Sequence, residues 1–392
     1  MELTEKKRIS YAPNMFEAYG EEEIQAVEKC LRDGFLAGFG KYSIEFEEKI
    51  SKMFSKKYGI FVNSGSSANL LALACLGLPK GSEVITPSCT FSTTVAPIIQ
   101  LGLKPIFCDV VLDRYIPSIE QIIEKITTDT KVIMIPNLIG NKPNWKQLKL
   151  YLQRIKREDI ILIEDSCDTI SETPESDIST TSFYASHLIT AGGLGGMVMV
   201  SSKHLKNKIL QYRDWGRMGD NSEKMSDRFN HKIDGIPYDH KFLYDVLGYN
   251  FKGSEMNAAF GLAQLNKFDN FKLIRRNNFK RYFDNLKDVK ELILPHEEEE
   301  INWLAFPFQL NPEYTDKTRV ELLTFLEEED IQTRVTFAGN ITRHPIYREY
   351  LKEFTNSDLI MEFGALVGCH HGMSVDDVDY VCSKIKEFFG KN

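Results

Sequence analysis

Short β-branched runs alternate with amphipathic stretches through the first two-thirds of the chain. Apolar runs that predict buried strands occupy residues 59–64, 82–88, 104–110, 131–137, 159–166 and 196–202. Between them, apolar positions recur with helical spacing, for instance at 118–126 and 145–157. Alternation of this kind favours a mostly parallel sheet that is covered by helices on both faces.

The last third of the chain has a different pattern. A long periodic segment, residues 254–287, predicts helices that leave the first unit. After it, strands are expected at 303–310 and 330–337, on either side of a helix at 317–328. Strands and helices spaced in this way indicate a smaller α+β unit.

The length of 392 residues allows two domains. We predict a large α/β domain with an N-terminal arm over residues 1–265 and a small C-terminal α+β domain over residues 266–392. Hydrophobic residues make up 42% and charged residues 27% of the chain, which is typical of a globular enzyme.

Charge and cysteine content argue against several classes of protein. The 48 Lys and Arg against 56 Asp and Glu give a net charge of −8, which does not favour nucleic-acid binding. The apolar stretches are too short to span a bilayer, and the N-terminus lacks the apolar core of a signal peptide, so a cytoplasmic location is expected. The seven cysteines form no CxxC pair, so neither a metal site nor a disulfide framework is expected.

A candidate phosphate site lies at residues 63–74. A predicted strand ends there, Gly65, Ser66 and Ser67 form a turn, and a helix begins. Backbone N–H groups at a helix start, the helix dipole and two hydroxyls all favour a phosphate. Serine is also an ordinary helix cap, so this motif alone leaves both interpretations open.

Three further segments carry candidate ligand-binding side chains. A hydrophobic strand ends near Asp165, and ligands of open α/β sheets bind at the carboxyl ends of strands. A buried carboxylate at this place keeps a pyridine nitrogen protonated. Phe91, before a helix, can stack on a ring, although a lone phenylalanine more often belongs to the core. Asn250 can donate hydrogen bonds to an anion, although Gly248 beside it is equally consistent with a simple turn.

The segment 182–196 places a histidine between an apolar run and a glycine cluster. Imidazole carries protons near neutral pH, so His187 is a candidate acid–base group. From this segment alone, a hydrogen-bonded loop histidine is the more frequent situation.

The order of these segments resembles that of fold-type I enzymes that use pyridoxal 5′-phosphate (PLP), specifically the DegT/DnrJ/EryC1 family of nucleotide-sugar aminotransferases and dehydratases. The resemblance extends from about Phe35 to near the C-terminus. Ordinary members bind PLP covalently through a lysine where this chain has His187, and imidazole forms no stable imine with an aldehyde. Within the family the chain looks most like the GDP-4-keto-6-deoxy-D-mannose 3-dehydratases, which also carry histidine there. The segments that carry this likeness are 63–74, 91–100, 163–168, 182–190, 213–217, 238–242, 247–250 and 337–345.

The resemblance implies a role for each candidate side chain. His187 is the implied acid–base group. The implied phosphate ligands are Gly65, Ser66, Ser67 and Ser182, with Asn250 reaching the cofactor of a neighbouring subunit in a homodimer. The implied ring contacts are Phe91 by stacking, Asp165 at the pyridine nitrogen and Asp168 near the ring hydroxyl.

The resemblance also implies a reaction. Glutamate would convert PLP to the aminated form, pyridoxamine 5′-phosphate (PMP). The C3 hydroxyl of a nucleotide-linked 4-keto-6-deoxy sugar would then be removed and ammonia released, for the synthesis of a 3,6-dideoxy sugar in a surface polysaccharide. Arginines suit the diphosphate and the donor carboxylates. The substrate-binding candidates are Arg213, Arg217, Arg334 and Arg343, with Trp215 packing on base or sugar.

Alternatives remain at this stage. One is a 4-keto-sugar aminotransferase, but no lysine between Thr130 and Leu210 falls in the expected position. Another is a catalytically inactive binding or regulatory protein on the same scaffold. An iron–sulfur branch of the family, acting on CDP-sugars, is disfavoured because residues 213–249 contain no cysteine, and a [2Fe–2S] cluster needs about four thiolates. The nucleotide and the sugar stay open: GDP with a hexose is favoured over a GDP-heptose or a CDP-sugar.

Overall fold

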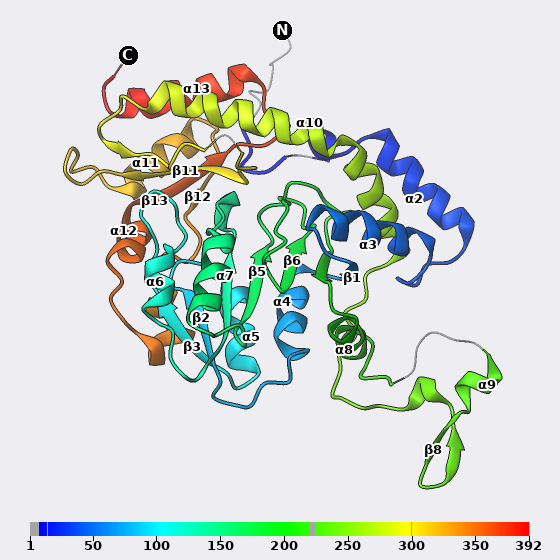
Figure 1. Cartoon of the computed structure of the whole chain (residues 1–392). Coiled ribbons are helices and arrows are strands. Elements are labelled where there is room, and N and C mark those ends of the chain that lie inside the picture. The colour runs from blue at the N-terminus through cyan, green and yellow to red at the C-terminus, as the bar shows by residue number, and fades with distance from the viewer. Residues whose placement is uncertain (1–7, 14, 219–223, 299, 392) are drawn as a thin grey trace.

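A seven-stranded sheet forms the centre of the computed structural model, which describes residues 8–13, 15–218, 224–298 and 300–391 (Figure 1). Its strand order is β1-β7-β6-β5-β4-β2-β3, and β7 alone runs antiparallel to its neighbours β1 and β6. The strands are β1 (Tyr58–Val62), β2 (Glu83–Pro87), β3 (Lys104–Cys108), β4 (Thr130–Pro136), β5 (Ile161–Ser166), β6 (Ile178–Ser182) and β7 (Gly196–Val200). The predictions of a mostly parallel sheet and of its strands are confirmed, except that the sixth strand, β6, was missed.

Helices cover both faces of this sheet. Along β4, Val132 and Met134 belong to one apolar cluster, whereas Ile133 and Ile135 belong to another. Successive side chains of a strand point to opposite faces, so both faces are buried. The first cluster involves α4 (Gly65–Ala74), α5 (Ser92–Gln100) and α8 (Lys203–Arg213), and the second involves α6 (Ile119–Ile123) and α7 (Trp145–Arg154).

A second, four-stranded antiparallel sheet belongs to the C-terminal part of the chain. Its order is β10-β11-β13-β12. The strands are β10 (Leu292–Ile293), β11 (Ala305–Leu310), β12 (Thr333–Val335) and β13 (Gly364–Gly368), with helices α11 (Arg319–Glu328), α12 (Thr355–Phe363) and α13 (Val375–Phe388) around them. The expected strands at 303–310 and 330–337 and the helix between them are confirmed. The strand β13, which pairs with both β11 and β12, was missed.

One helix joins the two sheets. The helix α10 (Glu255–Leu286) has 32 residues and packs on α2 (Glu21–Asp33), α3 (Lys41–Met53) and α13 (Figure 1). The segment 254–287 therefore forms one continuous helix, where several were expected. We keep the division at residue 265 as a proposal, and it falls inside α10.

The N-terminal arm lies against the small domain. Ile9 is buried in the main core and pairs with Ile331 beside β12. A short helix, α1 (Met15–Ala18), follows the arm and precedes α2. The arm therefore contacts a part of the chain that lies more than 300 residues away in sequence.

A hairpin projects from the body after α8 (Figure 1). It consists of α9 (Met225–Arg228), β8 (His231–Ile233) and β9 (Ile236–Tyr238), and its strands are exposed throughout. Short 3₁₀ segments occur at η1 (Leu138–Gly140), η2 (His240–Phe242), η3 (Ile341–Arg343) and η4 (Pro345–Tyr350). Among the described helices, none is both long and apolar enough to cross a membrane.

Candidate active site

A cavity of about 860 Å³ lies where the carboxyl ends of the sheet strands meet the small domain. The large domain contributes Asp165 from β5 and Ser182 from β6, and the small domain contributes Arg334 from β12. The carboxyl edge of an open α/β sheet is where ligands of such folds bind. The candidates Gly65, Ser66, Phe91, Asp168 and His187 also line this cavity, as expected from their order along the chain.

The turn before α4 forms a cradle at one end of the cavity. Ser64 caps the helix, since its Oγ accepts the N–H of Ser67 at 3.1 Å and also contacts the Ser67 hydroxyl. Ser67 is buried behind the turn and does not line the cavity. A Cβ on Gly65 would lie 2.6 Å from Cys167 Sγ and 2.7 Å from the Cβ of Ser182, so only glycine fits. The helix start is thus open to an anion.

Asp165 is a buried carboxylate at the floor of the cavity. Its Oδ2 accepts hydrogen bonds from Asn69 Nδ2 at 2.8 Å and from Thr94 Oγ1 at 2.7 Å, and its Oδ1 accepts the N–H of Cys167 at 3.2 Å. No Lys, Arg or His of the described residues forms an ion pair with it. A buried charge held only by neutral donors favours a cationic ligand group, such as a protonated ring nitrogen.

Asp168 lies three residues after Asp165, just beyond the end of β5. Its carboxylate accepts the N–H of Ile139 at 2.9 Å. Burial raises the pKa of the Asp168 carboxyl from its usual 3.8 to about 7, and the charge of Asp165 adds to this, while the hydrogen bond from Ile139 opposes it. Asp168 therefore carries a proton for much of the time at neutral pH.

The backbone that faces Asp168 is strained. Ile139 has φ 60° and ψ 6°, a left-handed conformation that costs a β-branched residue free energy. Its carbonyl accepts the N–H of Leu304 at 3.0 Å. Gly140 follows with φ 111°, and a Cβ there would lie 2.7 Å from the carbonyl oxygen of Asn302. The segment that enters the small domain thus holds this turn in place.

His187 sits in the loop after β6. Its backbone N–H donates to Tyr184 O at 3.0 Å, and the Tyr184 ring lies edge-on, with centroids 6.1 Å apart. The ring nitrogen Nδ1 is buried and has no hydrogen-bond partner in the described part of the chain. Burial lowers the pKa of the His187 imidazole from 6.5 to about 4. His187 is therefore neutral at pH 7 and able to accept a proton.

Phe91 is the residue before α5 and is 54% exposed, on the cavity side. Its ring meets that of Phe337 edge-on, with an interplanar angle of 84°. This geometry fits a stacking residue better than a core phenylalanine, which was the more frequent situation for a lone phenylalanine in the sequence.

A second hollow of about 400 Å³, which we call the basic pocket, is lined by Trp215, Arg217, Lys241, Asn250 and Lys252, together with residues 36–39 and Gly253. The charged groups of Arg217 and Lys252 each lie 4.4 Å from the centre of the Trp215 ring. Asn250 is in this pocket and does not line the cavity of Gly65 and Ser182.

The four candidate arginines lie in different surroundings. Arg334 lines the cavity. Arg213 is 2% exposed, and its guanidinium is bonded to Asp214 and to the carbonyl of Phe61, so it is not available to a substrate. Arg217 belongs to the basic pocket.

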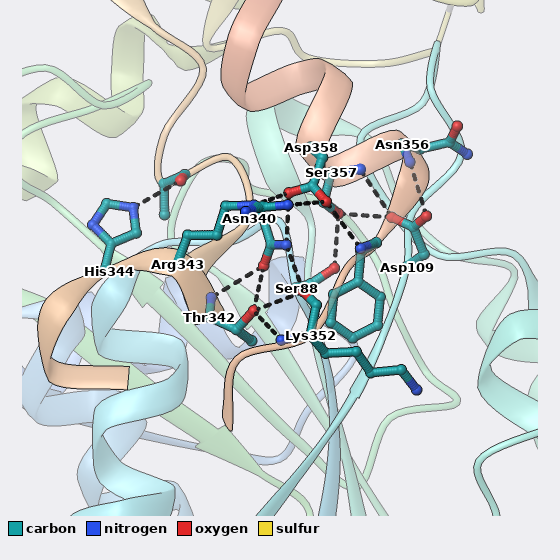
Figure 2. Close-up of polar contacts among 12 residues, drawn as sticks. Ser88, Asp109, Asn340, Thr342, Arg343, His344, Lys352, Asn356, Ser357 and Asp358 are labelled. Atoms are coloured by element: carbon teal, nitrogen blue, oxygen red, sulfur yellow. Dashed lines mark hydrogen bonds and ion pairs between the residues drawn. The ribbon is translucent and has the colours of Figure 1, made fainter. Parts of the chain in front are cut away.

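The guanidinium of Arg343 is also bonded to a protein group. Figure 2 shows its guanidinium and the amide of Asn340 converging on the carboxylate of Asp358. Beside them, Asp109 accepts the backbone N–H groups of Asn356 and Ser357. This network fixes the start of α12 to the end of β3. Arg343 therefore has a structural partner, and we leave it and Arg213 out of the proposed substrate contacts.

Some cavity and pocket residues were missed from the sequence. Tyr11 lines the cavity, and Lys241 and Lys252 line the basic pocket. Lys241 and Lys252 flank the segment 247–250, so their position next to a motif was a usable signal. For Tyr11 there was none, because its neighbours in the cavity are more than 50 residues away in sequence.

Comparisons with known proteins show which family the chain resembles over its length. A family model described as the DegT/DnrJ/EryC1/StrS aminotransferase family matches residues 17–386. The lipopolysaccharide biosynthesis protein RfbH of Salmonella typhimurium is 37% identical, over 98% of this chain and 93% of its own length. The dTDP-4-dehydro-2,6-dideoxy-D-glucose 3-dehydratase of Saccharopolyspora spinosa is 34% identical, over 95% and 85%. The solved structure of a GDP-4-keto-6-deoxymannose-3-dehydratase (ColD) mutant with bound GDP-perosamine has a TM-score of 0.85 and 27% identity, and the match covers 96% of this chain and 100% of that one.

The pKa of Asp168 makes a prediction about stability. A carboxyl whose pKa is raised from 3.8 in the unfolded chain to about 7 in the folded one stabilises the fold while protonated, and this stabilisation is lost as the pH rises through 7. We therefore compare the free energies of unfolding of Asp168→Asn and wild type, both without ligands. When the pH is raised from 5 to 8, the difference should shift in favour of the variant by roughly 2–3 kcal/mol, because only the wild type has the carboxyl. Urea unfolding at both pH values measures this difference. The exposed Asp316→Asn is the control, and an equal change in both variants would contradict the assignment.

Proposed function

The chain belongs to the DegT/DnrJ/EryC1/StrS aminotransferase family, and we propose that it is a PLP/PMP-dependent 3-dehydratase of a nucleotide-linked 4-keto-6-deoxy sugar. The single observation that carries this proposal is His187. By the resemblance to the family, His187 corresponds to the lysine of ordinary members, and none of the described residues that line the cavity is a lysine. An imidazole in that place can move protons but cannot retain the cofactor as an imine.

The residues of the cavity fit PLP. The open start of α4 with Gly65 and Ser66, together with Ser182, suits its phosphate. The Asp165 carboxylate, which lacks a cationic partner among the described residues, suits a protonated pyridine nitrogen. Phe91 offers a ring face, and Asp168, which also lines the cavity, would be the partner of the ring hydroxyl. When bound, the cofactor supplies an amine and an electron-accepting ring.

The chain's own residues handle the protons. His187 is neutral, so its imidazole is the proposed acceptor of a proton at the reaction centre. The imidazolium formed in this way then donates to the hydroxyl oxygen that leaves C3. Glutamate is the proposed amine donor, and Arg334, at the cavity wall, is the proposed partner of its carboxylate. The proposed products are ammonia, the 2-keto acid formed from glutamate, which supplies the two electrons for the deoxygenation, and a 4-keto-3,6-dideoxy sugar. The sugar would supply a surface polysaccharide.

GDP with a hexose remains the nucleotide sugar that we favour. The likeness of the whole chain to the GDP-4-keto-6-deoxymannose-3-dehydratase structure supports it. The 34% identity to a dehydratase named for a dTDP-sugar makes dTDP a further candidate, beside a CDP-sugar. The proposed reaction at C3 is the same for each of these nucleotides.

We propose a homodimer in which each subunit completes the cavity of the other. Asn250 and Gly65 lie in two separate hollows of one chain, so both can meet one cofactor phosphate only if a second copy brings its basic pocket to the cavity. Exposed Leu36, Phe39 and Trp215 at this pocket give a second copy an apolar surface to cover. Arg217, Lys241 and Lys252 would then lie near the diphosphate of the substrate.

Two other functions stay possible within this scaffold. An aminotransferase would need another group in place of the lysine to complete its cycle. An inactive binding protein would have no need for an unpaired His187 nitrogen or for the polar floor at Asp165. Incubation with PLP, glutamate and a GDP-4-keto-6-deoxy sugar distinguishes them, since ammonia with a deoxygenated C3 indicates dehydration, an amino sugar indicates transamination, and no turnover indicates a binder.

Replacing His187 by lysine should change how the cofactor is held. With His187→Lys we expect covalent attachment of PLP, because the lysine amine forms an imine with the aldehyde, and loss of dehydration by more than about 100-fold, because the proton-transfer group is gone. Borohydride reduction followed by mass spectrometry measures the attachment, and ammonia release measures the activity. Covalently attached PLP in the wild type, or full dehydration activity in His187→Ala, would overturn the proposal.

A mixed dimer tests the shared site. His187→Ala removes the proton carrier from one subunit's cavity, and Lys252→Ala weakens the basic pocket of the other; each variant alone should be nearly inactive. Co-expressed, half of the dimers are hybrids, and each hybrid keeps one intact site, so about a quarter of the wild-type activity should return. Mixing His187→Ala with the surface variant Lys203→Ala is the positive control. No recovery in the first mixture, beside recovery in the control, would contradict the shared site.

A further inference from the structure

We propose that Tyr11, brought into the cavity by the N-terminal arm, is a substrate-binding residue whose hydroxyl donates a hydrogen bond to an oxygen of the sugar. The inference rests on the proposed function, since it needs the sugar to enter the cavity of His187 and Asp165. It adds a contact from a part of the chain that lies before the residues matched by the family model, which begin at residue 17.

The arm holds Tyr11 in a defined position. Ile9 donates its N–H to Asp330 O at 2.8 Å and accepts the N–H of Gln332 at 2.9 Å. The N–H of Tyr11 donates to Gln332 Oε1 at 2.9 Å. These bonds bridge more than 300 residues of sequence, so the arm is fixed to the small domain before any ligand binds.

The end of strand β13 leaves space for the backbone of the arm. His370 Nε2 lies 3.0 Å from the carbonyl oxygen of Ser10. A Cβ on Gly368, at the end of β13, would lie 2.5 Å from the same oxygen, so a larger residue there would displace the arm. The backbone on either side of Tyr11 is therefore set by contacts that do not involve its own side chain.

The side chain of Tyr11 lines the cavity. The Arg334 guanidinium lies 5.3 Å from the centre of its ring, and both residues line the cavity with Asp168 and His187. The hydroxyl has no hydrogen-bond partner within the described ranges of the chain. By contrast, the hydroxyl of Tyr347, in the same cavity wall, is bonded to Ser92 Oγ at 2.8 Å.

The chemistry of this hydroxyl suits a neutral oxygen. Burial, and then the charge of Asp168, raise the pKa of the Tyr11 phenol well above its usual value of 10.0, against the opposing effect of Arg334 and Arg275. The phenol therefore stays protonated and acts as a donor. The charged parts of the reactants, the diphosphate and the glutamate carboxylates, suit the basic pocket and Arg334 better. The sugar hydroxyls and ketone are the uncharged acceptors that remain.

Tyr11→Phe is the variant that separates this role from a structural one. It keeps the ring, its contact with Arg334 and all backbone bonds of the arm, and it removes only the hydroxyl. Tyr380→Phe is the matched control, because Tyr380 lies in the small domain outside the cavity and its hydroxyl bonds Glu329. Both variants and the wild type are loaded with PMP and titrated with GDP-perosamine and with GDP by calorimetry.

We expect Tyr11→Phe to bind GDP-perosamine about tenfold more weakly than wild type and GDP equally well, because GDP has no sugar to contact. The dehydration of GDP-4-keto-6-deoxy-D-mannose should fall in kcat/KM by a similar factor, while the reaction of PLP-loaded protein with glutamate keeps its rate. Equal affinities of Tyr11→Phe and wild type for GDP-perosamine would overturn the inference. So would a parallel loss for GDP, a slower reaction with glutamate alone, or the same loss in Tyr380→Phe.

Failure of the proposed function would be seen in a different measurement, namely the activity of the wild type. It would be seen in the wild type, as absence of dehydration with GDP-, dTDP- and CDP-linked sugars. If only the nucleotide is wrong, the wild type binds the dTDP- or CDP-sugar in place of the GDP-sugar, and the comparison of Tyr11→Phe with wild type is made on that pair of ligands. A wild type that binds no nucleotide sugar overturns both proposals.

Discussion

A buried carboxylate with no cationic partner among the described residues is the feature around which the site is arranged. Asp165 ends a fully covered strand, and the helices α4 and α5 supply Asn69 and Thr94, whose neutral donors hold both its position and its charge. The same two helices present Gly65 and Phe91 to the cavity at their first turns. A single position in the sheet thus determines where a cationic ring, a phosphate and a stacking side chain can meet. The proposed chemistry depends on this negative floor, because an electron-accepting ring needs its nitrogen protonated.

The junction between the domains extends this arrangement. Arg275, buried within α10, donates to the carbonyl oxygens of Leu304 and Trp303. Leu304 in turn donates to Ile139, and Ile139 donates to Asp168. The strained backbone of Ile139 is kept by this chain of bonds, since a relaxed conformation would turn its N–H away from the carboxyl. The small domain therefore shapes the cavity in two ways, through the turn that faces Asp168 and through the wall that carries Tyr11 and Arg334.

The sequence predicted best those features that are determined by residues close together in the chain. Residues 132–136 of the run at 131–137 are all apolar because β4 is covered on both faces. The turn at Gly65 combines a strand end with a helix start within a few residues. The order of such segments was enough to bring Phe91, Asp165, Asp168 and His187 into one cavity. Whether an arginine faces a ligand depends on residues that are distant from it in sequence. Arg213 is engaged by the carbonyl of Phe61, 152 residues away, and Arg343 by Asp358 on another helix, while Arg334 is left at the cavity wall. Tyr11 was out of reach for the same reason, because its place depends on pairing with residues more than 300 positions away.

The surroundings of His187 decide the order in which it can act. A histidine with the ordinary pKa of 6.5 could begin a reaction at neutral pH either as base or as acid, which is how the sequence alone presented it. Burial in this cavity lowers the pKa to about 4, so the resting imidazole has no proton to give and its first act is to accept one. Its acidic form then arises only within the reaction, beside the group that is to leave, and an acid formed there has a strong tendency to give up its proton. A lysine amine at the same position would hold the cofactor between these steps. In the proposed function, an imidazole leaves that task to the helix start, the carboxylate and the ring of Phe91, which requires that those contacts be built into the fold in advance.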